Sequence, residues 1–188
     1  AAVEALKLMD AMGLLEAEKD IETLNLETVR AMAQRAASAG IGETAVVALR
    51  TRTKPQSHDV EAALETLRSA LEASPVPEFE WPSLIELFGA EQLAGLVGVS
   101  VASLRRYAGG ARTTPDAVAA RLHVLAQLTA DLRGAYSEVG VRRWFERKRT
   151  KLDGLAPRDI LRGDWDPDAT GPQEVRALAR SLAGASAT

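Results

Sequence analysis

Residues 91–107, EQLAGLVGVSVASLRRY, have the spacing of two short helices joined by a tight turn. Ala94 is small at the point where the two helices must cross closely, and Gly98 stands where such a turn requires a positive φ. Leu104 and Tyr107 are apolar at positions where the second helix packs back on the first. These sizes and spacings allow the segment few conformations, and they predict a helix-turn-helix.

The second helix of this pair begins with small outward side chains and continues with two arginines. Ser100 is expected to cap it, because a serine oxygen accepts hydrogen bonds from the free N–H groups of a first turn. Small side chains let a helix enter a DNA groove, and arginines can then reach guanine edges or phosphates. We therefore expect double-stranded operator DNA as a partner. The candidate DNA contacts are Gln92, Ser100, Val101, Ala102, Ser103, Arg105, Arg106 and Arg112.

The pattern A-x3-G-V-S-x3-L-x2-Y in this segment resembles the Xre-type, Cro/repressor-like helix-turn-helix. That resemblance implies a dimer that places two such helices in major grooves roughly 34–36 Å apart.

Charge is distributed unevenly along the chain, although the net charge is only −3. Residues 101–163 contain thirteen Lys and Arg against six Asp and Glu, which gives +7, whereas residues 1–80 carry −6. The basic block includes the second helix of the helix-turn-helix, and a local excess of cations is what binding to phosphates requires. The run of cations at residues 142–151 has three interpretations: contacts to phosphates, contacts to an acidic partner, or a solvated helix face.

Composition predicts an all-α fold, because Ala, Leu, Glu and Arg dominate and β-branched runs are short. Cysteine is absent and there are two histidines, so we expect neither disulfides, nor a metal site, nor a cofactor. Asp164, Asp166 and Asp168 alternate, but they lack the glycine and glutamate spacing of a calcium loop. No apolar run approaches the roughly 20 residues of a membrane span, and no leader opens the chain, so we expect a cytoplasmic protein without membrane contact.

The chain divides into four parts by pattern. Residues 1–74 form a helical N-terminal module, in which residues 43–53 suit a strand as well as a helix, with helix favoured. Residues 75–82, with closely spaced prolines, are expected to be an extended linker. Residues 83–136 hold the helix-turn-helix and then a long helix with one apolar stripe, and residues 137–188 form a C-terminal helical unit.

Helix boundaries follow from capping residues. Asn25 is expected to cap a helix that stops near Gly40. Ser83 should begin the helix after the linker through a capping box, and Thr114 should cap the long helix. Basic residues at positions 50–54 offer a second surface for DNA.

The C-terminal unit carries a W-F pair, then L-x-G-x-x-P-x-x-x-L beginning at Leu152, then G-x3-V-x2-L beginning at Gly171. This order resembles the C-terminal domain of MbcA/ParS/Xre-type antitoxins, which follows an Xre-like helix-turn-helix. The resemblance implies binding to a RES-domain toxin that degrades NAD. The run ERKRTK after the W-F pair, the insertion WDPDAT and the first 74 residues depart from the family pattern. The candidate partner-binding residues are Trp144, Arg158, Asp164, Asp166, Val175 and Arg176, although we expect Trp144 mainly to anchor the core.

These expectations combine into an antitoxin that binds DNA as a homodimer, represses its own operon and covers a RES-type toxin. The two functions are expected to be separable, so that removing the chain after Gly163 would spare DNA binding. One alternative is a stand-alone Xre-type repressor without a toxin, and another is an adaptor that has lost affinity for DNA. We expect no enzymatic activity, because His123 has no nearby Ser or Asp motif and no glycine-rich phosphate loop follows a strand.

Overall fold

The computed structural model describes residues 2–15, 25–50 and 56–185, and this part of the chain is all helical, as predicted. Among its helices, none is both long and apolar enough to cross a bilayer. In chain order the elements are α1 (Ala2–Ala11), α2 (Leu26–Ser38), α3 (Glu43–Arg50), α4 (Ser57–Ala73), α5 (Pro77–Phe88), α6 (Ala90–Val97), α7 (Val101–Ala108), α8 (Asp116–Arg133), α9 (Glu138–Glu146), the 3-10 turn η1 (Thr150–Leu152), α10 (Pro157–Ile160) and α11 (Thr170–Ala185).

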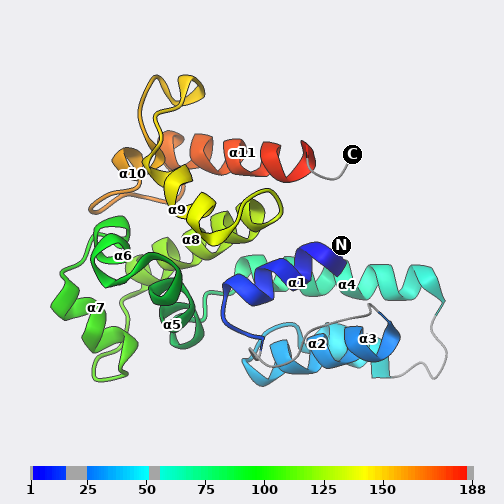
Figure 1. Cartoon of the computed structure of the whole chain (residues 1–188). Coiled ribbons are helices and arrows are strands. Elements are labelled where there is room, and N and C mark those ends of the chain that lie inside the picture. The colour runs from blue at the N-terminus through cyan, green and yellow to red at the C-terminus, as the bar shows by residue number, and fades with distance from the viewer. Residues whose placement is uncertain (1, 16–24, 51–55, 186–188) are drawn as a thin grey trace.

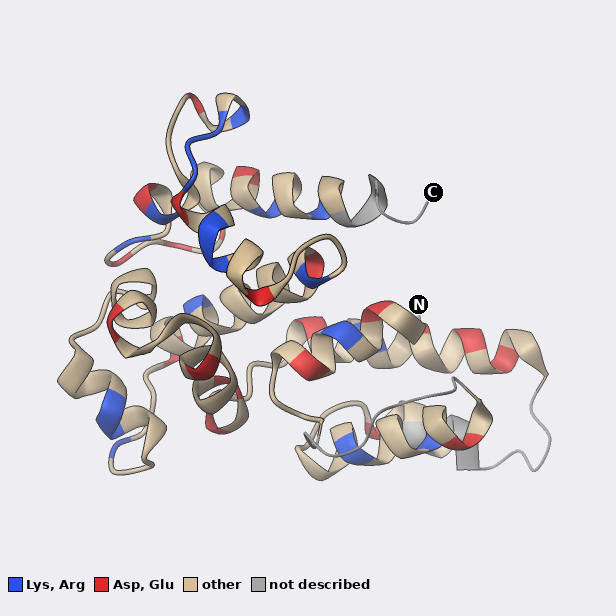
Figure 2. Ribbon diagram, in the orientation of Figure 1, with Lys and Arg blue, Asp and Glu red and all other residues tan. Residues whose placement is uncertain are grey.

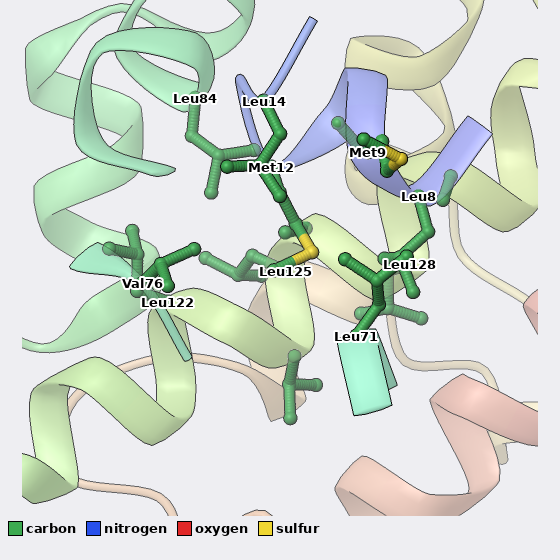
Figure 3. Packing of buried hydrophobic residues seen from close by; sticks show 14 of the residues in the cluster. Leu8, Met9, Met12, Leu14, Leu71, Val76, Leu84, Leu122, Leu125 and Leu128 are labelled. Carbon is green, nitrogen blue, oxygen red and sulfur yellow. The ribbon is translucent and has the colours of Figure 1, made fainter. Parts of the chain in front are cut away.

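Helix α8 lies at the centre of the molecule, and α1, α5, α6, α9 and α11 all contact it (Figure 1). Thirteen of its eighteen residues are buried, so it is enclosed on nearly every side rather than along the single stripe that its leucines predict. Figure 3 shows Leu122, Leu125 and Leu128 of α8 meeting apolar side chains from α1, α4 and α5. The other elements are arranged around this helix.

The N-terminal helices share this core. Helix α1 packs against both α4 and α8, and α2 and α3 pack beside α4. One cluster of buried apolar side chains extends from Ala5 in α1 to Ala179 in α11. The units predicted from sequence pattern are therefore packed around common side chains. The basic side chains predicted as a second DNA surface at positions 50–54 lie outside the described residues.

The prediction of an extended linker at residues 75–82 is wrong, because α5 already begins at Pro77 and continues through Pro82. Pro77 occupies the first helical position, where a missing N–H costs nothing. Pro82 removes one internal hydrogen bond, a loss of about 3 kcal/mol in an isolated helix. Burial of Trp81 and Leu84, on either side of it, offsets that cost.

Several helix boundaries can be compared with their predicted caps. The Asn25 side chain accepts a hydrogen bond from the N–H of Thr28, and α2 ends at Ser38, so both predictions there are confirmed. Residues 43–50 are helical, as favoured, and residues 51–53 of that prediction lie outside the described residues. Ser83 lies inside α5 rather than at its start. Thr114 does not cap α8, which begins after Pro115, because its hydroxyl instead accepts a hydrogen bond from the Trp81 indole at 2.9 Å.

A buried acid and a buried histidine join α5 to α8. The Glu80 carboxylate lies 2.5 Å from Nδ1 of His123, whose Nε2 lies 3.0 Å from the carbonyl oxygen of Glu72. Both ring nitrogens thus face oxygens. The Glu72 carbonyl oxygen can only accept, so Nε2 must carry a proton, and a second proton must lie on either Nδ1 or the Glu80 carboxyl group. Burial raises the pKa of Glu80, in the direction that keeps such a proton in place.

The carboxyl group of Asp131 makes the fold sensitive to pH. It lines a polar cavity of about 500 Å³ among α1, α4, α8 and α11, 4.0 Å from Arg180. Burial raises its pKa from 3.8 to about 6. The folded state therefore holds this proton more tightly than the unfolded chain does, and its stabilising effect is present below pH 4 and disappears as the pH rises through 6.

We predict that Asp131→Asn raises the free energy of unfolding at pH 7 by roughly 1–2 kcal/mol and makes it less dependent on pH between 4 and 7. Urea denaturation at several pH values measures both effects. Glu61→Gln, at an exposed position of α4, is the matched control and should leave the pH dependence unchanged. An unchanged slope in Asp131→Asn would contradict the assignment.

Candidate nucleic-acid interface

Helices α6 and α7 form the predicted helix-turn-helix. Gly98 ends α6 with φ 73° and ψ 37°, the left-handed conformation that favours glycine. Its N–H donates to the carbonyl oxygen of Ala94, and the N–H of Val99 donates to the same oxygen at 3.0 Å. The two helices are therefore joined by a tight turn with a positive φ at Gly98, as the sequence predicted.

Helix α7 starts at the predicted cap. The Ser100 hydroxyl accepts a hydrogen bond from the N–H of Ser103 at 3.1 Å. Ala102, Arg105 and Arg106 are exposed on the outer face of the helix, whereas Leu104 is 1% exposed and points inward. The helix thus presents a small side chain near its start and two guanidinium groups near its end.

Trp81 of α5 packs against the inner face of α7. The rings of Trp81 and Tyr107 stack with centroids 6.2 Å apart and planes inclined by 19°. The Trp81 side chain is fully buried, and its bond to Thr114 fixes the ring. This stack holds the inner face of α7 against a rigid neighbour, so its outer face is held in a defined orientation.

The remaining candidate DNA contacts differ in their accessibility. Ser100 and Arg112 are exposed, and the Arg112 guanidinium lies 5.8 Å from the centroid of the Tyr107 ring. Val101 and Ser103 are half-buried. The amide nitrogen of Gln92 is buried and has no hydrogen-bond partner. Its side chain therefore does not lie on the outward face that the other candidates share.

Nine of the thirteen cations in the basic block form two groups in space, whereas Arg121 and Arg133 are paired with carboxylates elsewhere. Arg105, Arg106 and Arg112 lie on α7 and the loop after it, at one end of the molecule (Figure 2). The cations of residues 142–151 lie along α9 and the segment after it, elsewhere on the surface. Arg142 donates to the carbonyl oxygen of Leu87, which makes it part of the packing of α9 on α5. The excess of +7 is therefore not one continuous surface.

The candidate partner-binding residues fall into three environments. Trp144 and Val175 are buried at 1% and 0% exposure, so they pack the C-terminal unit from inside. The expectation that Trp144 anchors the core is confirmed, and the assignment of both residues to a partner surface is corrected. Arg176 donates inward to Gln127 at 2.6 Å. Arg158 is exposed and lies 3.6 Å from Glu146, and Asp166 is exposed as well.

The three aspartates after α10 do not converge on one point. Asp164 pairs with Arg121 of α8, and Asp166 accepts a hydrogen bond from the N–H of Asp168 at 2.9 Å. Within the described residues, no group of three potential metal ligands occurs.

Comparisons with known proteins add no family assignment. No family model matches the chain, and no curated protein or solved structure is significantly similar to it. The assignment of a site therefore depends on the geometry of this chain.

A contact that the sequence did not predict joins the turn of the helix-turn-helix to a distant loop. Gly163, in the loop between α10 and α11, lies directly against Gly98. A Cβ atom on Gly98 would lie 2.9 Å from the Cα of Gly163 and would overlap its carbonyl group. Trp165 and Arg121 belong to the same contact. A tryptophan among aspartates, and an arginine next to the apolar stripe of α8, are the two sequence signals that point to it.

We predict that Gly98→Ala lowers the free energy of unfolding by about 3 kcal/mol, because the new methyl group adds a steric overlap to the strained backbone. Gly110→Ala is the matched control, since Gly110 has φ 69° but nothing within 4 Å of its Cβ position. It should cost only about 1 kcal/mol. Chemical denaturation measures both values. Equal losses would show that the contact with Gly163 does not constrain the turn.

Proposed function

We propose that this chain is a DNA-binding transcription regulator that inserts α7 into the major groove of an operator. The observation that carries the proposal is the outer face of α7, where small side chains precede two exposed arginines and the inner face is fixed by Trp81 and Leu104. A small leading face allows close approach to the bases, and arginines bind guanine edges or phosphates. In this proposal the chain has no catalytic role.

The charge distribution supports approach to DNA through the end of the molecule that carries α7. Residues 1–80 carry a net −6, and phosphates repel that part of the chain. Arg105, Arg106 and Arg112 form the nearest group of cations on α7 and its following loop. In the proposal a homodimer applies two copies of α7 to a palindromic site in the cytoplasm and thereby represses its own operon.

We predict that Arg105→Ala and Arg106→Ala each weaken binding to the specific duplex by about 1–3 kcal/mol. The specific duplex is the sequence upstream of the gene, and titration by mobility shift at several salt concentrations compares it with random DNA of equal length. Lys148→Ala, which removes an exposed cation after α9, is the matched control and should leave the affinity unchanged. Equal affinity of the unaltered chain for both duplexes would refute specific DNA binding.

We further propose that the C-terminal unit binds a RES-type toxin, which makes the chain an antitoxin. The support is the order of motifs in the sequence, together with Arg158 and Asp166, two candidate contacts whose side chains are exposed. A stand-alone repressor without a toxin is the alternative.

We predict that cells expressing an adjacently encoded RES-type toxin keep normal NAD levels and growth when this chain is co-expressed. Arg158→Ala combined with Asp166→Ala should reduce protection and co-purification, because the expected contact surface loses both charges. The Arg105→Ala variant should protect cells from the toxin fully, since Arg105 lies on α7 and outside the C-terminal unit. If no toxin co-purifies with the unaltered chain, the stand-alone repressor is the better account.

A further inference from the structure

The C-terminal end of α6 is completed by residues far away in the sequence. The last carbonyl groups of a helix have no partner within the helix and must find one elsewhere. The Ala94 carbonyl finds it in the turn itself, through the N–H groups of Gly98 and Val99. The next two carbonyls, those of Gly95 and Leu96, have their partners in the loop between α10 and α11.

Gly163 and Trp165 supply these two partners. The N–H of Gly163 donates to the carbonyl oxygen of Gly95 at 3.4 Å, and the indole N–H of Trp165 donates to that of Leu96 at 2.7 Å. Trp165 is 8% exposed, so its bond to Leu96 is shielded from water, which strengthens it. The loop therefore acts as the C-terminal cap of α6.

The same loop is fastened to α8 by an ion pair. Arg121 is 4% exposed, and its guanidinium pairs with Asp164 and donates to the carbonyl oxygen of Trp165 at 3.4 Å. A buried guanidinium without its carboxylate is costly, so this pair holds the loop against α8. Residues 163–165 thus connect α6, α8 and the start of the C-terminal unit.

We propose that residues 163–165 are a positioning loop for the DNA-binding helix: they cap α6, fix the turn at Gly98 and so set the orientation of α7. This inference rests on the proposed binding of DNA by α7. Any partner that binds the C-terminal unit and displaces the loop then weakens DNA binding, and DNA weakens that partner by the same factor. Removing the chain after Gly163 is accordingly expected to impair DNA binding, contrary to the separable functions predicted from the sequence.

Trp165→Phe tests the loop because it removes the N–H donor and keeps most of the ring. We expect the duplex dissociation constant to rise roughly five- to tenfold, because a buried carbonyl loses its partner. We also expect the amides of Val99 and Leu104, which are bonded within the turn and the start of α7, to exchange with solvent roughly five- to tenfold faster. Exchange of the amides in the middle of α8 should stay unchanged, which separates positioning from a general loss of stability.

Trp144→Phe is the matched control, since the indole nitrogen of Trp144 is buried without a partner in the same C-terminal unit. It should leave both the dissociation constant and the exchange at the turn within about twofold of the unaltered chain. Asp164→Asn, at an exposed side chain, is a second variant that should act in the same direction as Trp165→Phe, because it weakens the pair with Arg121.

Unchanged exchange at Val99 and Leu104 in Trp165→Phe would overturn the proposal, as would equal effects of Trp165→Phe and Trp144→Phe. If the unaltered chain binds no duplex, the proposed function fails. The exchange measurement then still decides whether the loop fixes the turn.

Discussion

Helix α8 is buried nearly all round, and three of its polar side chains are bonded to other parts of the chain. Arg121 pairs with Asp164 before α11, His123 meets Glu80 of α5, and Gln127 donates to the carbonyl oxygen of Glu72 at 2.8 Å. Together these residues join α8 to α4, to α5 and to the loop before α11. Since an unpaired buried polar group is costly, the fold tolerates little displacement of any of them.

The sequence predicts the helices well where the signal is local. Asn25 and Ser100 cap helices because a side-chain oxygen next to the first turn is all that a cap needs, and Gly98 turns the chain because its own backbone allows a positive φ. The segment at Pro77 and Pro82 could not be predicted in this way. Its helix depends on the buried environment of Trp81 and on the pairing of Glu80 with His123, which are separated by 43 residues.

In the candidate site, too, the local features follow from the sequence and the long-range contacts do not. The outward face of α7 follows from the helical period, which places Ala102 and Arg106 on one side and Leu104 on the other. The orientation of that face does not follow from any local rule. It depends on Trp165, 69 residues after Leu96, and on Arg121, whose partner Asp164 lies 43 residues away in the sequence. A motif comparison treats the C-terminal unit as an appended module, whereas in the fold it contacts the turn directly.

The contact between Gly98 and Gly163 also has a consequence for evolution. Gly98 has two independent reasons to remain glycine, its backbone conformation and the carbonyl group of Gly163 against it. Gly163 has φ 68° but open space at its Cβ position, so only its backbone restricts it. In descendants of this chain that lose or reposition the loop, asparagine becomes acceptable at position 98, because it tolerates the left-handed conformation. Substitutions at the two glycines are therefore expected to be ordered in time, with the loop changing first.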